Sequence, residues 1–78
     1  MNLDRTVAVA RAALKYSGPG PLSTGEALTA ALVLNRHDWL TTLGYTIAEA
    51  LDRVDSDTIQ RLRAAERIVL EELEPAHG

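Results

Sequence analysis

The sequence predicts an all-α fold, a compact bundle of four or five short helices, and three observations favour it. Ala and Leu supply most of the apolar residues, while the aromatic residues are few and Phe is absent. Ala has the highest helix propensity, whereas the β-branched and aromatic residues that favour strands are scattered. The helix-start pattern Ser/Thr-x-x-Glu occurs at Ser23 and again at Thr46. Apolar residues also recur at steps of three and four, the period of an amphipathic helix.

The length and composition predict one small cytoplasmic domain. Seventy-eight residues make a single domain near the lower limit of independent folding, which we place at residues 1–74 with a flexible tail at 75–78. The chain has no cysteine, which excludes disulfides and cysteine-ligated zinc and favours a reducing compartment. No apolar run approaches the roughly 20 residues of a membrane span, and the first residues do not resemble a signal peptide. We therefore expect a cytoplasmic protein without a membrane partner.

The charge is uneven along the chain. Residues 1–45 carry four basic and three acidic side chains, a net charge of +1, whereas residues 46–78 carry four basic and eight acidic side chains, a net charge of −4. The acidic half repels polyanions and favours a basic partner, within a screening length of about 8 Å at physiological salt.

The first two predicted helices flank a Pro/Gly-containing linker. Asn2 or Asp4 can cap a helix over residues 4–16, and the linker over residues 17–22 ends it because proline lacks a backbone donor. The second helix starts at Ser23 or Thr24 and ends near residue 35. It is apolar on nearly every side apart from Thr29, which predicts a central helix flanked by the first and last helices. The predicted inward residues are Leu3, Val7, Ala10 and Leu14 in the first helix, and Ala27, Leu28, Ala31, Leu32 and Leu34 in the second.

Two short helices are predicted on either side of Gly44. The glycine can adopt the left-handed conformation that ends the helix at 38–43, Asn35 or His37 would lead into that helix, and Tyr45 would fold back on its last turn. The following helix, residues 47–54, starts with the Thr46 capping box. Whether the two are separate or one kinked unit stays open. We expect Trp39, Leu40 and Leu43 to face inward from the first, and Ile47, Ala50, Leu51 and Val54 from the second.

The last helix, from Asp57 or Thr58 to about residue 73, carries the residues predicted to bind a partner. Its buried stripe is Ile59, Leu62, Ala65, Val69 and Leu73. Ile68 and Leu70 lie off that stripe and are predicted to form an exposed apolar strip. Carboxylates at a helix C-terminus are disfavoured by the helix dipole, so the glutamates there are candidates for binding a basic partner. The predicted binding residues are Ile68, Leu70, Glu71, Glu72 and Glu74, with Tyr45, whereas Trp39 is assigned mainly to the core.

The alternative function is DNA binding by a helix-turn-helix over residues 46–54 and 57–73, with Thr58, Gln60, Arg61 and Arg63 reading bases. The objection is electrostatic, because Asp55 and Asp57 would lie beside the phosphates and the region has a net charge of −4. We therefore do not expect a nucleic-acid partner.

No enzyme, metal or cofactor motif is present in the sequence. The histidines are His37 and His77, and neither has the spacing of a metal site. His37 beside Asp38 is the sole acid–imidazole neighbour pair, but adjacent helical residues point in different directions. No phosphate-binding glycine loop follows Gly18 and Gly20, so no small-molecule ligand is evident.

Residues 30–40 and 44–51 resemble small uncharacterised helical proteins found in bacterial genomes and their prophages. The resemblance covers about a quarter of the chain and implies a bacterial origin but no activity. We predict a non-catalytic module that binds another protein or itself, including as a homodimer.

Overall fold

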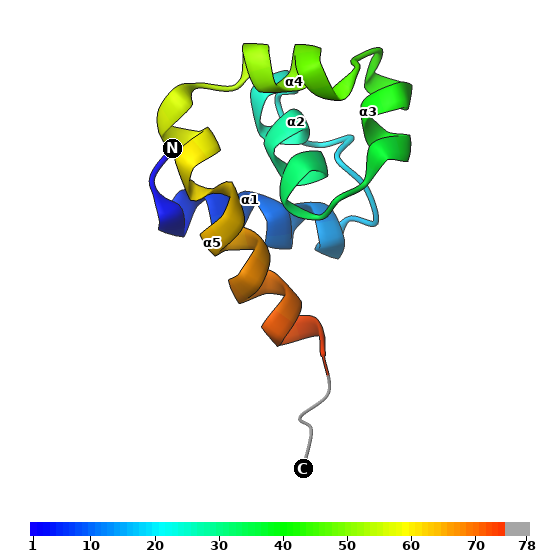
Figure 1. Ribbon diagram of the computed structural model, residues 1–78. Helices are drawn as coiled ribbons and strands as arrows, with labels where there is room; N and C mark the ends of the chain where they lie inside the picture. The colour runs from blue at the N-terminus through cyan, green and yellow to red at the C-terminus, as the bar shows by residue number, and fades with distance from the viewer. Residues whose placement is uncertain (75–78) are drawn as a thin grey trace.

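The computed structural model describes residues 1–74, which form five α-helices joined by short turns (Figure 1). The all-α prediction is confirmed. The tail predicted to be flexible, residues 75–78, lies outside the described residues. The helices are α1 (Leu3–Lys15), α2 (Thr24–Val33), α3 (His37–Leu43), α4 (Ile47–Arg53) and α5 (Ser56–Leu73).

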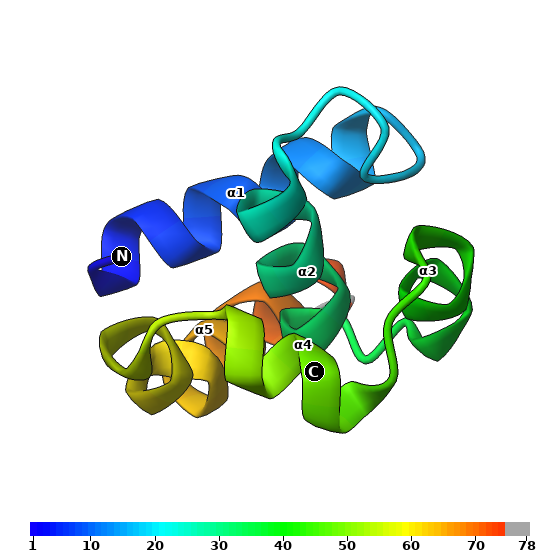
Figure 2. The same ribbon diagram turned by 90° about the horizontal axis from the view of Figure 1, so that it is seen from above.

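Helix α2 is the centre of the domain, as its apolar sequence predicts. It contacts each of the other four helices, and Figure 2 shows it between α1 on one side and α4 on the other. Ala27, Leu28 and Ala30 are almost fully buried. Thr29 is also buried, and its hydroxyl donates to the carbonyl of Gly25 at 2.8 Å. The buried hydroxyl of Thr29 therefore has a hydrogen-bond partner within α2, while the small alanine side chains let the neighbouring helices pack closely.

Helices α1 and α5 flank α2 and also pack on each other. Their shared cluster contains Val7 and Ala10 of α1, Val33 of α2, and Ala65 and Val69 of α5. A second cluster joins α1 and α2 to α3 and α4, and its buried residues are Val9, Ala13, Leu28, Ala30, Ala31, Trp39, Leu40, Ala50 and Val54. The assignment of Trp39 to the core is confirmed.

Local capping signals set most of the helix starts. Asn2, Ser23, Thr46 and Asp55 each accept a hydrogen bond from a backbone N–H of the first turn, and the capping boxes at Ser23 and Thr46 are complete. Helix α3 is the exception: Arg36 stands at its cap position without a side-chain bond. The prediction that Asn35 or His37 would lead into this helix is therefore wrong.

Gly44 separates α3 from α4, as its position in the sequence predicts. Its φ of +85° is in the left-handed region that favours glycine. The next N–H, from Tyr45, bonds to the carbonyl of Leu40 at 2.9 Å, and the Tyr45 side chain packs partly buried against the core. The two helices are separate elements rather than one kinked unit.

Four predictions of side-chain burial are wrong. Ile47 and Leu51 of α4 and Leu73 of α5 were expected in the core, but they are 51%, 37% and 56% exposed. Helix α4 has only two turns and reaches the core through Ala50, while none of the helices within residues 1–74 covers most of the Leu73 side chain. Ile68 was expected in solvent but lies partly buried against the α1–α5 cluster.

Candidate protein-binding surfaces

Large apolar side chains are exposed in pairs at two places on the surface. Leu70 and Leu73 lie together on the last turns of α5, and Ile47 and Leu51 lie one turn apart on α4. Tyr16, directly after α1, is also exposed, but the side chain that contacts its ring is the charged Lys15. Clustered exposed apolar residues mark interaction surfaces more often than isolated ones do.

The first surface is the α5 end, which we define as residues 70–74. In Figure 1 the C-terminal turns of α5 run past α1 and away from α3 and α4. Val69 is 1% exposed, whereas Leu73, four residues further on the same side of the helix, is 56% exposed. Leu70 is 46% exposed. The apolar side of α5 thus continues beyond the part that the domain covers.

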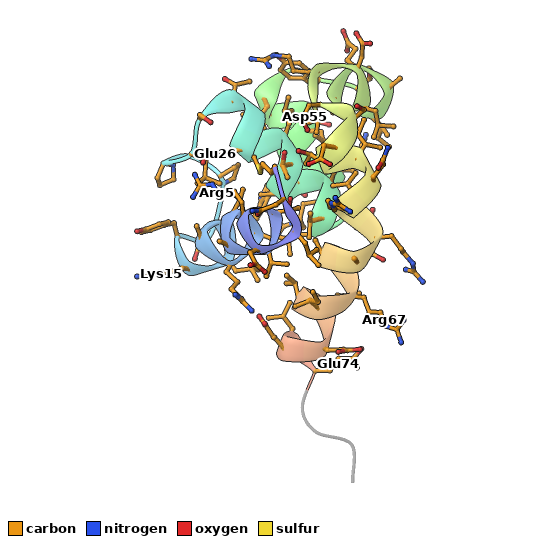
Figure 3. All side chains as sticks on the ribbon, turned by 90° about the vertical axis from the view of Figure 1, so that its left-hand side faces the viewer. Arg5, Lys15, Glu26, Asp55, Arg67 and Glu74 are labelled. Atoms are coloured by element: carbon orange, nitrogen blue, oxygen red, sulfur yellow. The ribbon has the colours of Figure 1, made fainter. Side chains whose placement is uncertain are left out.

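Carboxylates surround these leucines. Residues 66–74 carry four glutamates and one arginine, a net charge of −3. Arg67 contacts Glu71 at 3.5 Å, and Figure 3 shows Glu74 at the tip of the projecting helix. The helix dipole does not favour this cluster.

Glu72 has a structural role that the sequence did not reveal. Both carboxylate oxygens accept hydrogen bonds from Arg11 of α1, one of them from Nε at 2.9 Å. The hydrogen bond from Arg11 lowers the pKa of Glu72 below its ordinary value. Glu72 therefore ties α5 to α1, so this predicted binding residue also serves the fold.

The second surface is the α4 groove, lined by Ala31, Leu32, Leu40 and Ile47. Its volume is about 80 Å³. Leu51, 37% exposed, lies one turn after Ile47 on α4. This surface could not be predicted from the sequence, because isoleucine and leucine in a short amphipathic helix form the same pattern whether they are exposed or buried.

Exposed polar residues complete the lining of the α4 groove, and they are Asn35, Arg36 and His37. Arg36 donates from Nε and Nη2 to the Asp38 carboxylate at 2.9 and 2.7 Å. Its guanidinium also lies 4.4 Å from the ring centre of Trp39. These contacts hold Arg36 in place at the groove.

The pair His37 and Asp38, considered as an acid–imidazole pair, is not arranged as a catalytic couple. Asp38 is held by Arg36, whose hydrogen bonds lower the Asp38 pKa below its ordinary value. His37 instead lines the α4 groove and a wider pocket of about 370 Å³ that includes Tyr45 and Glu49. Glu49 is itself engaged in the capping box with Thr46. Within residues 1–74, no cluster of three or more metal-ligating side chains is present.

The start of α5 gathers charged groups into a compact network. The Met1 ammonium donates to the Thr58 hydroxyl at 2.7 Å and to Asp55 at 3.3 Å, and it lies 3.9 Å from Asp57. Hydrogen bonds from the hydroxyl and the backbone N–H of Thr58 lower the pKa of Asp55, with a smaller contribution from the ammonium. Met1, Asp55 and Thr58 line a pocket of about 250 Å³ together with Arg53.

The residues predicted to read bases in the DNA-binding alternative do not form a basic face. Thr58 is 1% exposed and bonded to Met1. Arg61 pairs with Asp57 at 3.4 Å, and Arg63 pairs with Glu66 at 2.7 Å. Gln60 is exposed. Helices α4 and α5 both pack on α2.

Comparison with protein families, with curated proteins and with solved structures gave no match to this chain. The resemblance to small bacterial and prophage proteins therefore stays a prediction. No helix within residues 1–74 is long and apolar enough to cross a membrane.

Proposed function

We propose that the protein is a non-catalytic interaction module that binds a protein partner through the α5 end. The observation that carries the proposal is the exposure of Leu70 and Leu73 together on a helix that projects from the domain. A partner that covers adjacent exposed apolar residues stabilises the complex by about 25 cal/mol per Å² of apolar surface removed from water.

The charge around the α5 end supports a partner with basic groups. The net charge of −3 over residues 66–74 attracts cations and repels nucleic acid. Of the predicted partner-binding residues, Leu70, Glu71 and Glu74 belong to this surface in the proposal. Glu72 and Ile68 hold α5 against the domain, through the bonds to Arg11 and through packing on the α1–α5 cluster. Tyr45 does not belong to this surface.

A capture experiment tests the proposal. The protein and the double variant Leu70→Gln/Leu73→Gln are immobilised and exposed to a bacterial lysate, and retained proteins are identified by mass spectrometry. Glutamine keeps the helix propensity while removing the apolar surface. We expect a protein retained by the unmodified chain to be lost from the double variant.

The control is Tyr16→Gln, which removes a side chain of similar exposure that belongs neither to residues 70–74 nor to the lining of the α4 groove. It should retain the same proteins as the unmodified chain. If the double variant retains them equally well, the α5 end is not the binding surface.

DNA binding through Thr58, Gln60, Arg61 and Arg63 ranks second, because the two arginines are paired with carboxylates. Binding to duplex DNA that weakens steeply with salt, and that is lost in Arg61→Ala/Arg63→Ala, would reverse this order. We place the protein in the cytoplasm because it has no cysteine.

A further inference from the structure

We propose that the partner segment covering the α5 end is a basic amphipathic α-helix. Its apolar stripe packs on Leu70 and Leu73, and its lysine or arginine side chains lie beside the glutamates around them. This inference rests on the proposed function and deepens it, since it names the kind of segment that the α5 end binds.

The backbone of the α5 end is helical, which limits how a peptide can bind there. The helix continues to Leu73, and the N–H of Glu74 donates to the carbonyl of Leu70 at 3.0 Å. A partner strand needs the free edge of a sheet, and a proline-rich segment needs a groove lined by aromatic residues. Residues 66–74 form no strand and include no aromatic residue. The packing of one helix on another is the common recognition mode that fits this surface.

The two exposed leucines form a short ridge that fits between the side chains of another helix. Leu70 and Leu73 are three residues apart, a rise of about 4.5 Å, so they project from neighbouring turns. Ridges with this spacing pack into the grooves of a second helix. In Figure 1 the last turns of α5 run past α1 and away from α3 and α4. A partner helix can therefore lie along the part of each leucine that the domain leaves in water.

The charge of the α5 end favours a basic helix over an acidic one. Residues 66–74 have a net charge of −3, and counting also the two arginines that pair with Glu66 and Glu72 leaves it at −1. Arg67 contacts Glu71 at 3.5 Å across an exposed ion pair, which contributes little to stability and can exchange for a cation of the partner. Figure 3 shows Arg67 and Glu74 on the projecting part of α5. We assign Glu71 and Glu74 to the basic side chains of the partner helix.

The last turn of α5 also lacks the basic side chain that a helix C-terminus favours. Lys15 and Arg53 stand in the last turns of α1 and α4, whereas the last turn of α5 has no basic residue. The helix dipole places roughly half a negative elementary charge at this end. A cation supplied by a partner is therefore favoured by the dipole and by the carboxylates together.

Titration of the isotope-labelled protein with two matched peptides, followed by NMR, tests the proposal. The basic peptide has about 14 residues, enough for a helix, with leucine at every third or fourth position and lysine or alanine between. The acidic peptide has glutamate in place of each lysine. Both are used at concentrations at which they are monomeric. The basic peptide should shift the amide signals of residues 66–74 and gain helix on binding, as measured by circular dichroism. The acidic peptide should bind about tenfold more weakly.

Two double variants test the role of the leucines. Leu70→Gln/Leu73→Gln should weaken binding of the basic peptide by about tenfold or more, because it removes the apolar surface that the peptide covers. The matched control Ile47→Gln/Leu51→Gln removes the other exposed apolar pair and should leave binding unchanged. Circular dichroism and thermal unfolding establish that each variant is folded, which the exposure of the changed residues favours.

Two further variants test the role of charge, with opposite expected signs. Glu71→Gln/Glu74→Gln should weaken binding of the basic peptide by about twofold to fivefold, and Arg67→Gln should strengthen it by a similar factor. Both differences should shrink at high salt, because salt screens exposed charges.

Three results would overturn the inference: a basic peptide that leaves the signals of residues 66–74 unchanged, one that binds Leu70→Gln/Leu73→Gln equally well, or an acidic peptide that binds as tightly. None of them decides the proposed function. That proposal fails separately, if the lysate experiment retains the same proteins with and without Leu70 and Leu73. A protein captured through the two leucines, together with a silent peptide titration, would keep the proposed function and reject the basic helix.

Discussion

The two ends of α5 differ in what covers them, although one amphipathic pattern runs through both. At its start Thr58 is 1% exposed, and Asp55 and the Met1 ammonium complete its hydrogen bonds. At its end Leu73, the last residue of the apolar stripe, is 56% exposed. Periodicity therefore selects the side of a helix that can be buried, whereas the length and position of its neighbours decide how much of that side is buried.

The largest expected effect separates the covered part of the stripe from the uncovered part. Val69→Ala should lower the free energy of unfolding by about 2 kcal/mol, because Val69 is 1% exposed and its removal leaves a cavity. Denaturant unfolding measures this change. The matched change Leu73→Ala should stay within about 0.5 kcal/mol. Equal losses at the two positions would mean that the α5 end is covered in solution.

A smaller loss is expected at the start of α5. Asp55→Ala removes the acceptor that caps the helix and the carboxylate that holds the Met1 ammonium, so the melting temperature should fall. Asp57→Ala should lower it less, since Asp57 makes only the longer contacts to Met1 and Arg61. The two variants are compared by thermal unfolding, and the reverse order would contradict the assigned cap.

Acid should destabilise the protein through carboxylates at both ends of α5. The pKa values of Asp55 and Glu72 are lowered by hydrogen bonds from Thr58 and Arg11 respectively. A lowered pKa in the folded state contributes stability above the unfolded value, and that stability is lost as the pH falls through the folded value. We therefore expect the free energy of unfolding to decrease below about pH 4.

The acid dependence is measured by denaturant unfolding at a series of pH values. Asp55→Asn and Glu72→Gln should each make the decrease shallower, because each removes one titrating carboxylate. A pH profile that neither substitution changes would show that other groups cause the acid effect.

The smallest expected effect is at the α5 end itself. Leu70→Gln/Leu73→Gln should leave the stability of the monomer within about 0.5 kcal/mol, since both leucines are about half exposed and glutamine keeps the aliphatic part of the side chain. Denaturant unfolding at low concentration checks this. A large loss would assign these leucines to the fold rather than to binding.

Helix positions could be predicted from the sequence because their signals are local. Ser23 with Glu26 and Thr46 with Glu49 begin helices where the capping pattern predicts, and Gly44 ends one in the left-handed conformation. These residues act within one turn, so neighbours in the sequence contain the information.

Exposure could not be predicted in the same way. Ile47 was expected in the core but is exposed, and Ile68 was expected in solvent but is partly buried, because their burial depends on which helices pack beside them. Likewise, the Arg11–Glu72 pair joins residues 61 positions apart, and nothing near either residue indicates it. The α4 groove was missed for this reason, whereas the exposed Leu70 was predicted from its place off the stripe.

The packing of α1 on α5 also has a consequence for the order of folding. The Met1–Thr58 and Arg11–Glu72 contacts join residues 57 and 61 positions apart, whereas α2, α3 and α4 meet through near neighbours. Closing a long loop costs more entropy than closing a short one, and distant contacts slow folding. We infer that α1 and α5 dock on each other after the helices that are neighbours in the sequence have packed. Val69→Ala should then mainly accelerate unfolding in stopped-flow experiments, and a slowed refolding rate would place the docking before the rate-limiting step.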